Sequence, residues 1–207
     1  MESAKKNLQD SYNFKNIDEL LKYYDSWETY EQDLMALGYF GPIACTALLY
    51  KHVDKNKKIL EVGCGPGNVG RHLRLMNFTN IDGLDGSQGM VKRAADSKVY
   101  NKVHHHIISE KPLPVTEFDV LLGVGVFTVG HFPQGAMKLC FDSLKVGGYF
   151  CFSGTQKVLD SYFQQEFAHV QSKSKLIDST QPQFIVPFAG ENNQYLAKGY
   201  LFQKLTD

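Results

Sequence analysis

Three glycines, each separated from the next by one residue, directly follow a short apolar run that carries an acid. Residues 59–62 predict a buried strand containing Glu61, and Gly63, Gly65 and Gly67 predict a turn that leads into a helix. A backbone without Cβ atoms adopts positive φ angles and lies directly against a ligand. The arrangement favours a nucleoside-bearing cofactor lying across the carboxyl end of the strand.

A second acid extends this site. Asp85 ends another apolar run, 81–85, and lies 20 residues after Gly65. A carboxylate there accepts hydrogen bonds from the two hydroxyls of a ribose, and capping of the next helix is its alternative role. Because Gly65, Gly67 and Gly70 also satisfy G-x-G-x-x-G, an NAD-dependent oxidoreductase is one reading of the loop.

Charge separates the two kinds of cofactor. A dinucleotide site holds an anionic pyrophosphate at the helix N-terminus, where a nearby carboxylate is unfavourable. Glu61 places a negative charge just before the glycines. The acid therefore favours a cofactor that carries an ammonium group and a sulfonium but no phosphate.

The segment Glu61-x-Gly63-x-Gly65-x-Gly67 resembles motif I of class I S-adenosylmethionine-dependent methyltransferases. Within roughly 56–154, three further segments resemble later motifs of that family in the same order: Asp85-Gly86-Ser87-x-x-Met90, 118–123 and 144–148. In the last of these, Val146 replaces the proline of L-K-P-G-G. Tyr24-Asp25-x-Trp27-x-x-Tyr30, together with 37–39 and 110–114, looks most like the Williams–Beuren-region methyltransferase-like family.

The resemblance implies S-adenosylmethionine as cofactor and S-adenosylhomocysteine as product. It implies that Asp85 holds the ribose and that Met90 lies against the adenine, with core packing as the alternative for Met90. Ser109 and Glu110 take the place of an Asp that many relatives use for the adenine amino group. The cofactor-binding residues we expect are Glu61, Gly63, Cys64, Gly65, Gly67, Asn68, Asp85, Gly86, Met90, Ser109, Glu110, Gly123, Trp27 and Tyr30.

The segment 123–131 follows the fourth predicted strand, where the acceptor is expected. It is apolar and rich in glycine, which suits a small-molecule acceptor. It lacks N-P-P-Y, D-P-P-Y and cysteine, which argues against the amino groups of bases or of glutamine and against cytosine C5. His131 is its only titratable side chain and the one candidate catalytic base; a surface-loop position is the alternative. Because no other catalytic side chain stands out, a non-catalytic S-adenosylmethionine-binding protein is a third hypothesis.

The amino-acid composition of the chain limits the kinds of partner that we expect. The 207 residues carry 22 basic and 22 acidic side chains, and a balanced charge argues against nucleic acid. No apolar run approaches about 18 residues, so we expect no membrane segment. The 4 cysteines show no C-x-x-C spacing, which favours a reducing compartment, the cytoplasm or the nucleus.

Three adjacent histidines, 104–106, alternate between the faces of a strand, so we expect no metal site. No feature indicates an oligomeric state.

The rest of the chain alternates between predicted strands and helices, which predicts a three-layer α/β/α sandwich. The resemblance implies a Rossmann-like, mostly parallel seven-stranded sheet closed by an antiparallel C-terminal hairpin. We expect one domain, 1–207, with an N-terminal helical lid or substrate segment (1–52) and a cofactor-binding core (53–207). The predicted strands are 58–62, 81–84, 103–108, 118–124 and 149–153, and the predicted hairpin strands are 184–188 and 195–202. The predicted helices lie within 17–37, 43–52, 67–76, 87–98, 134–144 and 158–172.

Aromatic residues concentrate in the lid segment. Tyr24, Trp27 and Tyr30 fall at i, i+3 and i+6, near one face of a single helix. As a lid, they would present a ring to the positive sulfonium and exclude water. Simple packing of the helix against the sheet is the alternative.

Overall fold

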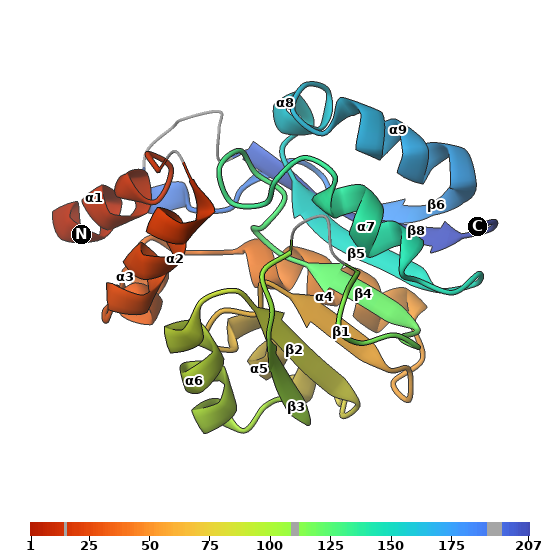
Figure 1. The fold of residues 1–207 in the computed structure, drawn as a ribbon, viewed down its shortest axis with the longest axis horizontal. Coiled ribbons are helices and arrows are strands. Elements are labelled where there is room, and N and C mark those ends of the chain that lie inside the picture. The colour runs from red at the N-terminus through yellow and green to blue at the C-terminus, as the bar shows by residue number, and fades with distance from the viewer. Residues whose placement is uncertain (15, 109–111, 190–195) are drawn as a thin grey trace.

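The computed structural model describes residues 1–14, 16–108, 112–189 and 196–207. Its central sheet follows the strand order β3-β2-β1-β4-β5-β8-β6 (Figure 1). The first five of these strands are mutually parallel, and β8 runs antiparallel to both β5 and β6. The strands are β1 (Ile59–Val62), β2 (Ile81–Asp85), β3 (Lys102–His105), β4 (Val120–Gly123), β5 (Tyr149–Gly154), β6 (Ser174–Ser179), β7 (Gln183–Phe184) and β8 (Leu196–Lys204). The predicted fold class, with its mixed seven-stranded order, is confirmed.

Helices cover both faces of this sheet. Side chains of α4, α5 and α6 pack on one face, and side chains of α7 and α9 pack on the other. Every residue of β1 and β4 is buried, because helices cover both faces of these strands. A strand in that position has mostly apolar side chains on both faces. The helices are α1 (Glu2–Asp10), α2 (Ile17–Ser26), α3 (Tyr30–Ala36), α4 (Gly41–His52), α5 (Asn68–Leu75), α6 (Gln88–Ser97), α7 (Ala136–Asp142), α8 (Gln156–Leu159) and α9 (Gln164–Lys173).

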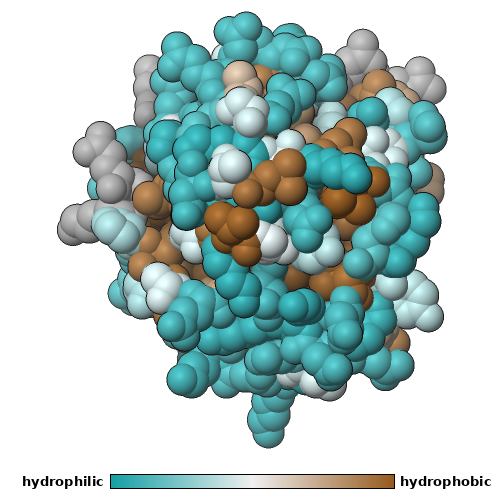
Figure 2. Space-filling view, turned by 90° about the vertical axis from the view of Figure 1, so that its right-hand side faces the viewer, coloured by the Kyte–Doolittle hydropathy of each residue, from teal (hydrophilic) through white to brown (hydrophobic). Residues whose placement is uncertain are grey.

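The C-terminal hairpin differs from the one expected. The strand that pairs with β8 along the sheet is β6, whereas 184–188 contributes only the short β7 and then a 3₁₀ turn at Pro187–Ala189. The sequence did not predict β6, because its side chains are largely polar. A strand at the edge of the sheet that faces water can have such side chains. Figure 2 looks onto the side of the molecule where β6 and α9 lie, and shows apolar patches scattered across a mostly polar surface. The predicted link through 190–193 lies outside the described residues.

The prediction of one continuous helix over 158–172 is also wrong. The chain instead forms α8 and α9, separated by a turn at 160–163. Leu159 and Phe163 on the two sides of this break are both fully buried in the main core. The turn allows both side chains to enter that core, and tertiary packing overrides the helical pattern.

The N-terminal helices form a cap beside the carboxyl ends of the parallel strands (Figure 1). Asn16 begins α2 by accepting a hydrogen bond from the Glu19 amide, and α2 ends before Trp27. Tyr24, Trp27 and Tyr30 therefore do not share one helical face, contrary to the prediction. They meet across the turn instead, with ring centroids 5.0 Å apart for Trp27 and Tyr30 and 5.9 Å for Tyr24 and Tyr30.

No helix in the described part of the chain is by itself long and apolar enough to cross a membrane. Taken together, α3 and α4 have the required length and composition, but they are bent by 84° relative to each other.

Candidate functional site

The glycine loop between β1 and α5 forms one wall of the site. Gly63, Gly65 and Gly67 have φ angles of +66°, +52° and +102°, which β-carbon-bearing residues rarely adopt. A Cβ on Gly63 would lie 2.3 Å from Val126 Cγ1, so that glycine is required for packing. A Cβ on Gly65 would meet nothing closer than the Tyr30 ring, at 4.0 Å. Gly65 therefore presents bare backbone to open space.

Asp85 ties this loop to the end of β2. Its Oδ2 accepts a hydrogen bond from the Gly65 amide at 2.8 Å, and its Oδ1 accepts one from the Ser87 amide at 2.9 Å. Burial raises the pKa of the Asp85 carboxyl. The helix cap is Ser87, whose hydroxyl accepts a hydrogen bond from the Met90 amide. Asp85 thus fixes two backbone segments while its carboxylate stays on the wall of a cavity.

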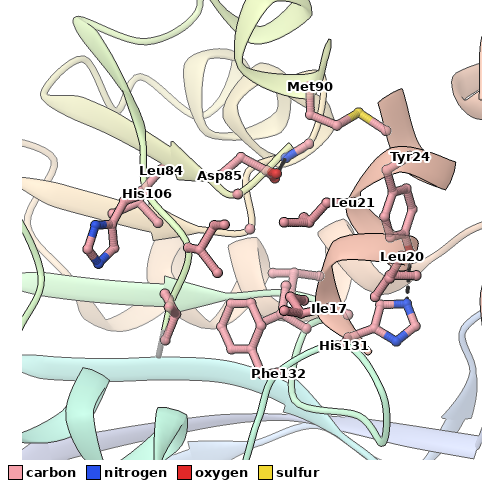
Figure 3. Close-up of a pocket in the computed structure, with 18 of the residues that line it drawn as sticks. Ile17, Leu20, Leu21, Tyr24, Leu84, Asp85, Met90, His106, His131 and Phe132 are labelled. Atoms are coloured by element: carbon pink, nitrogen blue, oxygen red, sulfur yellow. Dashed lines mark hydrogen bonds between the residues drawn. The ribbon is translucent and has the colours of Figure 1, made fainter. Parts of the chain in front are cut away.

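That cavity lies between the glycine loop and the N-terminal cap (Figure 3). Its walls surround about 750 Å³ of empty space, part of it open to solvent. Six of the expected cofactor residues line it: Gly63, Gly65, Asp85, Gly86, Met90 and Tyr30.

Other expected residues lie behind the wall. Glu61 is 1% exposed and accepts a hydrogen bond from the Tyr100 hydroxyl at 2.8 Å. Burial raises the pKa of Glu61 to about 8. A Cβ on Gly70 would lie 2.7 Å from the same tyrosine ring, so Tyr100 fills the space between Glu61 and α5. Glu61 therefore supports the glycine loop from inside.

The remaining expected residues have structural contacts. Cys64 is buried, and burial raises the pKa of its thiol. The Asn68 side-chain oxygen accepts a hydrogen bond from Arg71. A Cβ on Gly123 would lie 2.7 Å from Phe127, and Gly67 precedes α5 as its N-cap. Trp27 is buried and donates its indole N–H to Asp33 Oδ2 at 2.7 Å. Ser109 and Glu110, expected at the adenine, lie outside the described residues.

Hydrogen bonds fasten the cap to the core. Arg93 on α6 donates to the carbonyls of Trp27 and Tyr24, at 2.9 and 2.8 Å. Asp25 Oδ1 accepts hydrogen bonds from the Ser87 hydroxyl at 2.6 Å and from the Gly89 amide at 2.8 Å. These bonds hold α2 against the first turn of α6, over the cavity.

His131 is not a surface residue. Its Nε2 lies 2.7 Å from the Tyr24 hydroxyl, and its ring lies on the cavity wall (Figure 3). Burial lowers the pKa of His131 to about 4, because an imidazolium loses its hydration there, and the Val129 backbone offsets part of this effect. Burial also raises the pKa of Tyr24 well above its usual value. Both groups are uncharged near pH 7.

The structure adds wall residues that sequence reasoning missed. They are Ile17, Leu20, Leu21, Tyr39, Leu84, His106, Ile107, Ile108, Val124, Gly125, Val126 and Phe132. Val124, Gly125 and Val126 lie within the segment 123–131, where the acceptor was expected, and Gly125 has a φ of +71°. The others come from elements whose approach depends on tertiary packing. Among the described residues, no group of three His, Cys, Asp or Glu side chains is placed to hold a metal ion.

Comparison with known proteins agrees with this geometry. The model of the family described as "Methyltransferase domain" matches residues 60–152. The chain is 30% identical over 150 residues to human Methyltransferase-like protein 27, with 70% of this chain and 61% of the relative covered. It is 24% identical over 152 residues to Ubiquinone biosynthesis O-methyltransferase of Hydrogenovibrio crunogenus, with 71% and 63% covered. The chain thus spans about three fifths of the length of these curated relatives.

The fold has matches among solved structures. The crystal structure of a TehB-like SAM-dependent methyltransferase from Corynebacterium glutamicum superimposes with a TM-score of 0.62 at 17% identity. The match covers 88% of this chain and 98% of that one. Similarity at this level of identity concerns the fold.

Proposed function

We propose that the chain is a class I S-adenosylmethionine-dependent methyltransferase and that it transfers a methyl group from S-adenosylmethionine to a small molecule. The observation that carries the proposal is the pairing of Gly65 and Asp85. The bare backbone of one and the carboxylate of the other lie side by side on the wall of the same cavity.

We assign parts of the cofactor to parts of this wall. The methionine end would lie over Gly63 and Gly65, and the ribose would lie beside Asp85 with Gly86 adjoining it. Met90 would contact the adenine. Glu61, buried beneath the loop, would act on the cofactor only indirectly, through its hydrogen bond with Tyr100 behind the loop.

The cap suits the chemistry of the sulfonium. S-adenosylmethionine supplies a methyl group already activated for attack, so the protein has to align the acceptor and exclude water. Tyr24 and Tyr30 on the cavity wall offer ring faces to a positive charge. His131 remains uncharged near pH 7 and does not repel that charge.

We also propose membership in the Williams–Beuren-region methyltransferase-like family, supported by the 30% identity with human Methyltransferase-like protein 27. A small-molecule acceptor fits a cavity covered by three short helices. The zero net charge offers no general attraction for a nucleic acid backbone.

Calorimetry with S-adenosylmethionine, S-adenosylhomocysteine and NAD tests the cofactor assignment. We expect the first two to bind and NAD to show no heat of binding. The opposite pattern would favour the oxidoreductase reading. Incubation with a labelled methyl donor and a small-molecule extract then tests catalysis. Transfer of label to a small molecule is expected, and tight cofactor binding without transfer to any component would support the non-catalytic alternative.

A further inference from the structure

A second, smaller cavity adjoins the first beneath the N-terminal cap. Its walls surround about 440 Å³ of empty space, part of it open to solvent, and they include residues of α1, α3 and the segment 185–186. Five residues line both cavities: Tyr24, Tyr30, Tyr39, Gly125 and His131. The two spaces therefore meet at one wall, opposite the glycine loop.

We propose that this second cavity is the methyl-acceptor site, and that its acceptor is an uncharged molecule whose attacking nitrogen or sulfur already has a free lone pair. The inference rests on the proposed function, since it takes the larger cavity as the cofactor site. The shared wall is then the place where the methyl group passes from one cavity to the other.

The lining of the second cavity selects against negative charge. Leu8, Leu34, Ile185 and Val186 contribute apolar surface, and the polar groups are hydroxyls and one imidazole. Among the described residues that line it, none is Lys, Arg, Asp or Glu. A buried carboxylate there would lose its hydration without gaining a counterion, which is strongly unfavourable.

The shared wall is itself uncharged near neutral pH. Burial raises the pKa of Tyr24, Tyr30 and Tyr39, so all three stay protonated as phenols. Burial lowers the pKa of His131 to about 4, so its imidazole stays neutral. The wall offers hydrogen bonds to an acceptor without adding a charge.

The residues of the shared wall also limit which kind of acceptor atom attacks the methyl group. A neutral alcohol must lose a proton as it is methylated. His131 is a weak base for that task, because its Nε2 lies 2.7 Å from the Tyr24 hydroxyl and is engaged by it, and because burial lowers its pKa. A nitrogen or thioether sulfur with a free lone pair needs no base. Its lone pair forms the bond to the methyl carbon while the carbon–sulfur bond of the sulfonium breaks. The sulfur retains that electron pair, and the positive charge moves to the methylated acceptor.

The test uses heteroaromatic fragments such as quinoline in two matched forms: the neutral base and the ring carboxylate. Binding is measured by NMR to the protein saturated with S-adenosylhomocysteine, and methylation is measured with S-adenosylmethionine. Ile185→Phe fills the second cavity from a residue outside the first. Ile185→Lys adds a cation to the second cavity. Leu176→Phe on the exposed β6 edge is the matched control.

We expect binding to be confined to neutral members, to fall at least tenfold in Ile185→Phe, and to be unchanged in Leu176→Phe. Ile185→Lys should gain at least tenfold affinity for the carboxylates, a result that misfolding cannot produce. Matched phenols, such as naphthol, should not be methylated. Retained S-adenosylhomocysteine binding shows that each variant is folded.

Different failures have different meanings. If S-adenosylhomocysteine fails to bind the unchanged protein, the proposed function fails and the inference fails with it. If it binds, but charged members bind as well as neutral ones or Ile185→Phe leaves fragment binding intact, only the inference is overturned. A tenfold loss of S-adenosylhomocysteine affinity in Ile185→Phe would mean that the cofactor extends into the second cavity, which also overturns it.

Discussion

The Tyr24 hydroxyl and His131 Nε2 lie 2.7 Å apart, although 107 positions separate them in the chain. This contact joins α2 of the cap to the loop that follows β4, at the wall shared by the two cavities. It is a hydrogen bond between two uncharged groups, because burial opposes ionisation of both.

Protonation of His131 should destabilise the protein in acid. The folded-state pKa is about 4, and the ordinary value is 6.5, so the unfolded chain binds more protons between these limits. The contribution of this residue is therefore fully present above pH 6.5 and is lost as the pH falls toward 4. Urea unfolding from pH 4 to 7 should show a smaller decrease in His131→Gln than in the unchanged protein. His105→Gln is the control, and equal pH slopes in all three proteins would contradict the prediction.

Glu61 should have the opposite effect at higher pH. Its folded-state pKa is about 8 against an ordinary value of 4.5, so the folded state binds more protons between these limits. Stability from this residue should decrease as the pH rises from about 4.5 to about 8. Thermal unfolding at pH 6 and pH 8.5 should show a smaller difference in Glu61→Gln, which retains an acceptor for the Tyr100 hydroxyl. A pH dependence identical to that of the unchanged protein would show that Glu61 is ionised in the fold.

Gly65→Ala should reduce cofactor binding with a small loss of stability. The positive φ costs about 1 kcal/mol for a residue with a Cβ, and the new methyl group has room. It would occupy the space over the loop that we assign to the cofactor, so affinity for S-adenosylhomocysteine should fall at least tenfold. Gly147→Ala is the matched control, since its φ is +82° and no atom lies within 4 Å of its Cβ position. Equal affinities in the two variants, measured by calorimetry, would remove Gly65 from the cofactor site.

Asp85→Asn should weaken binding of both S-adenosylmethionine and S-adenosylhomocysteine. A hydrogen bond to a charged group contributes about 1.5–3 kcal/mol, which corresponds to a loss of roughly 10- to 100-fold. Asp82→Asn on the same strand does not touch either cavity and should bind normally. An Asp85→Asn variant that is folded by circular dichroism and retains full affinity would exclude the ribose assignment.

Arg93→Met should loosen the cap. The change removes hydrogen bonds to the carbonyls of Trp27 and Tyr24 while keeping most of the side-chain volume. Amide exchange in 17–36 should become faster, and saturation with S-adenosylmethionine should restore part of the protection. Lys92→Met, an exposed neighbour on the same helix, should leave exchange unchanged. Equal protection with and without cofactor in the unchanged protein would mean that the cap aromatics serve packing alone.

Local sequence patterns determined the core of the fold and the loop of the site. Apolar runs predicted β1, which also contains Glu61, and β4, which is unbroken, because strands covered on both faces are mostly apolar. Alternating glycines after an acid predicted the loop, and the spacing from Gly65 to Asp85 predicted a second acid in the same site. In the structure Asp85 accepts a hydrogen bond of 2.8 Å from the Gly65 amide. These features depend on residues close in sequence or on adjacent parallel strands.

Tertiary structure alone decided the rest. The edge position of β6 permits polar side chains that gave no strand signal, and burial of Phe163 broke the expected helix. Glu61 has the position in sequence of a ligand-binding acid, yet Tyr100 covers it from the connection between α6 and β3. Tyr24 and His131 meet only because the cap folds over the sheet. Contacts between distant segments depend on how helices pack, and periodicity within one segment carries no information about that packing.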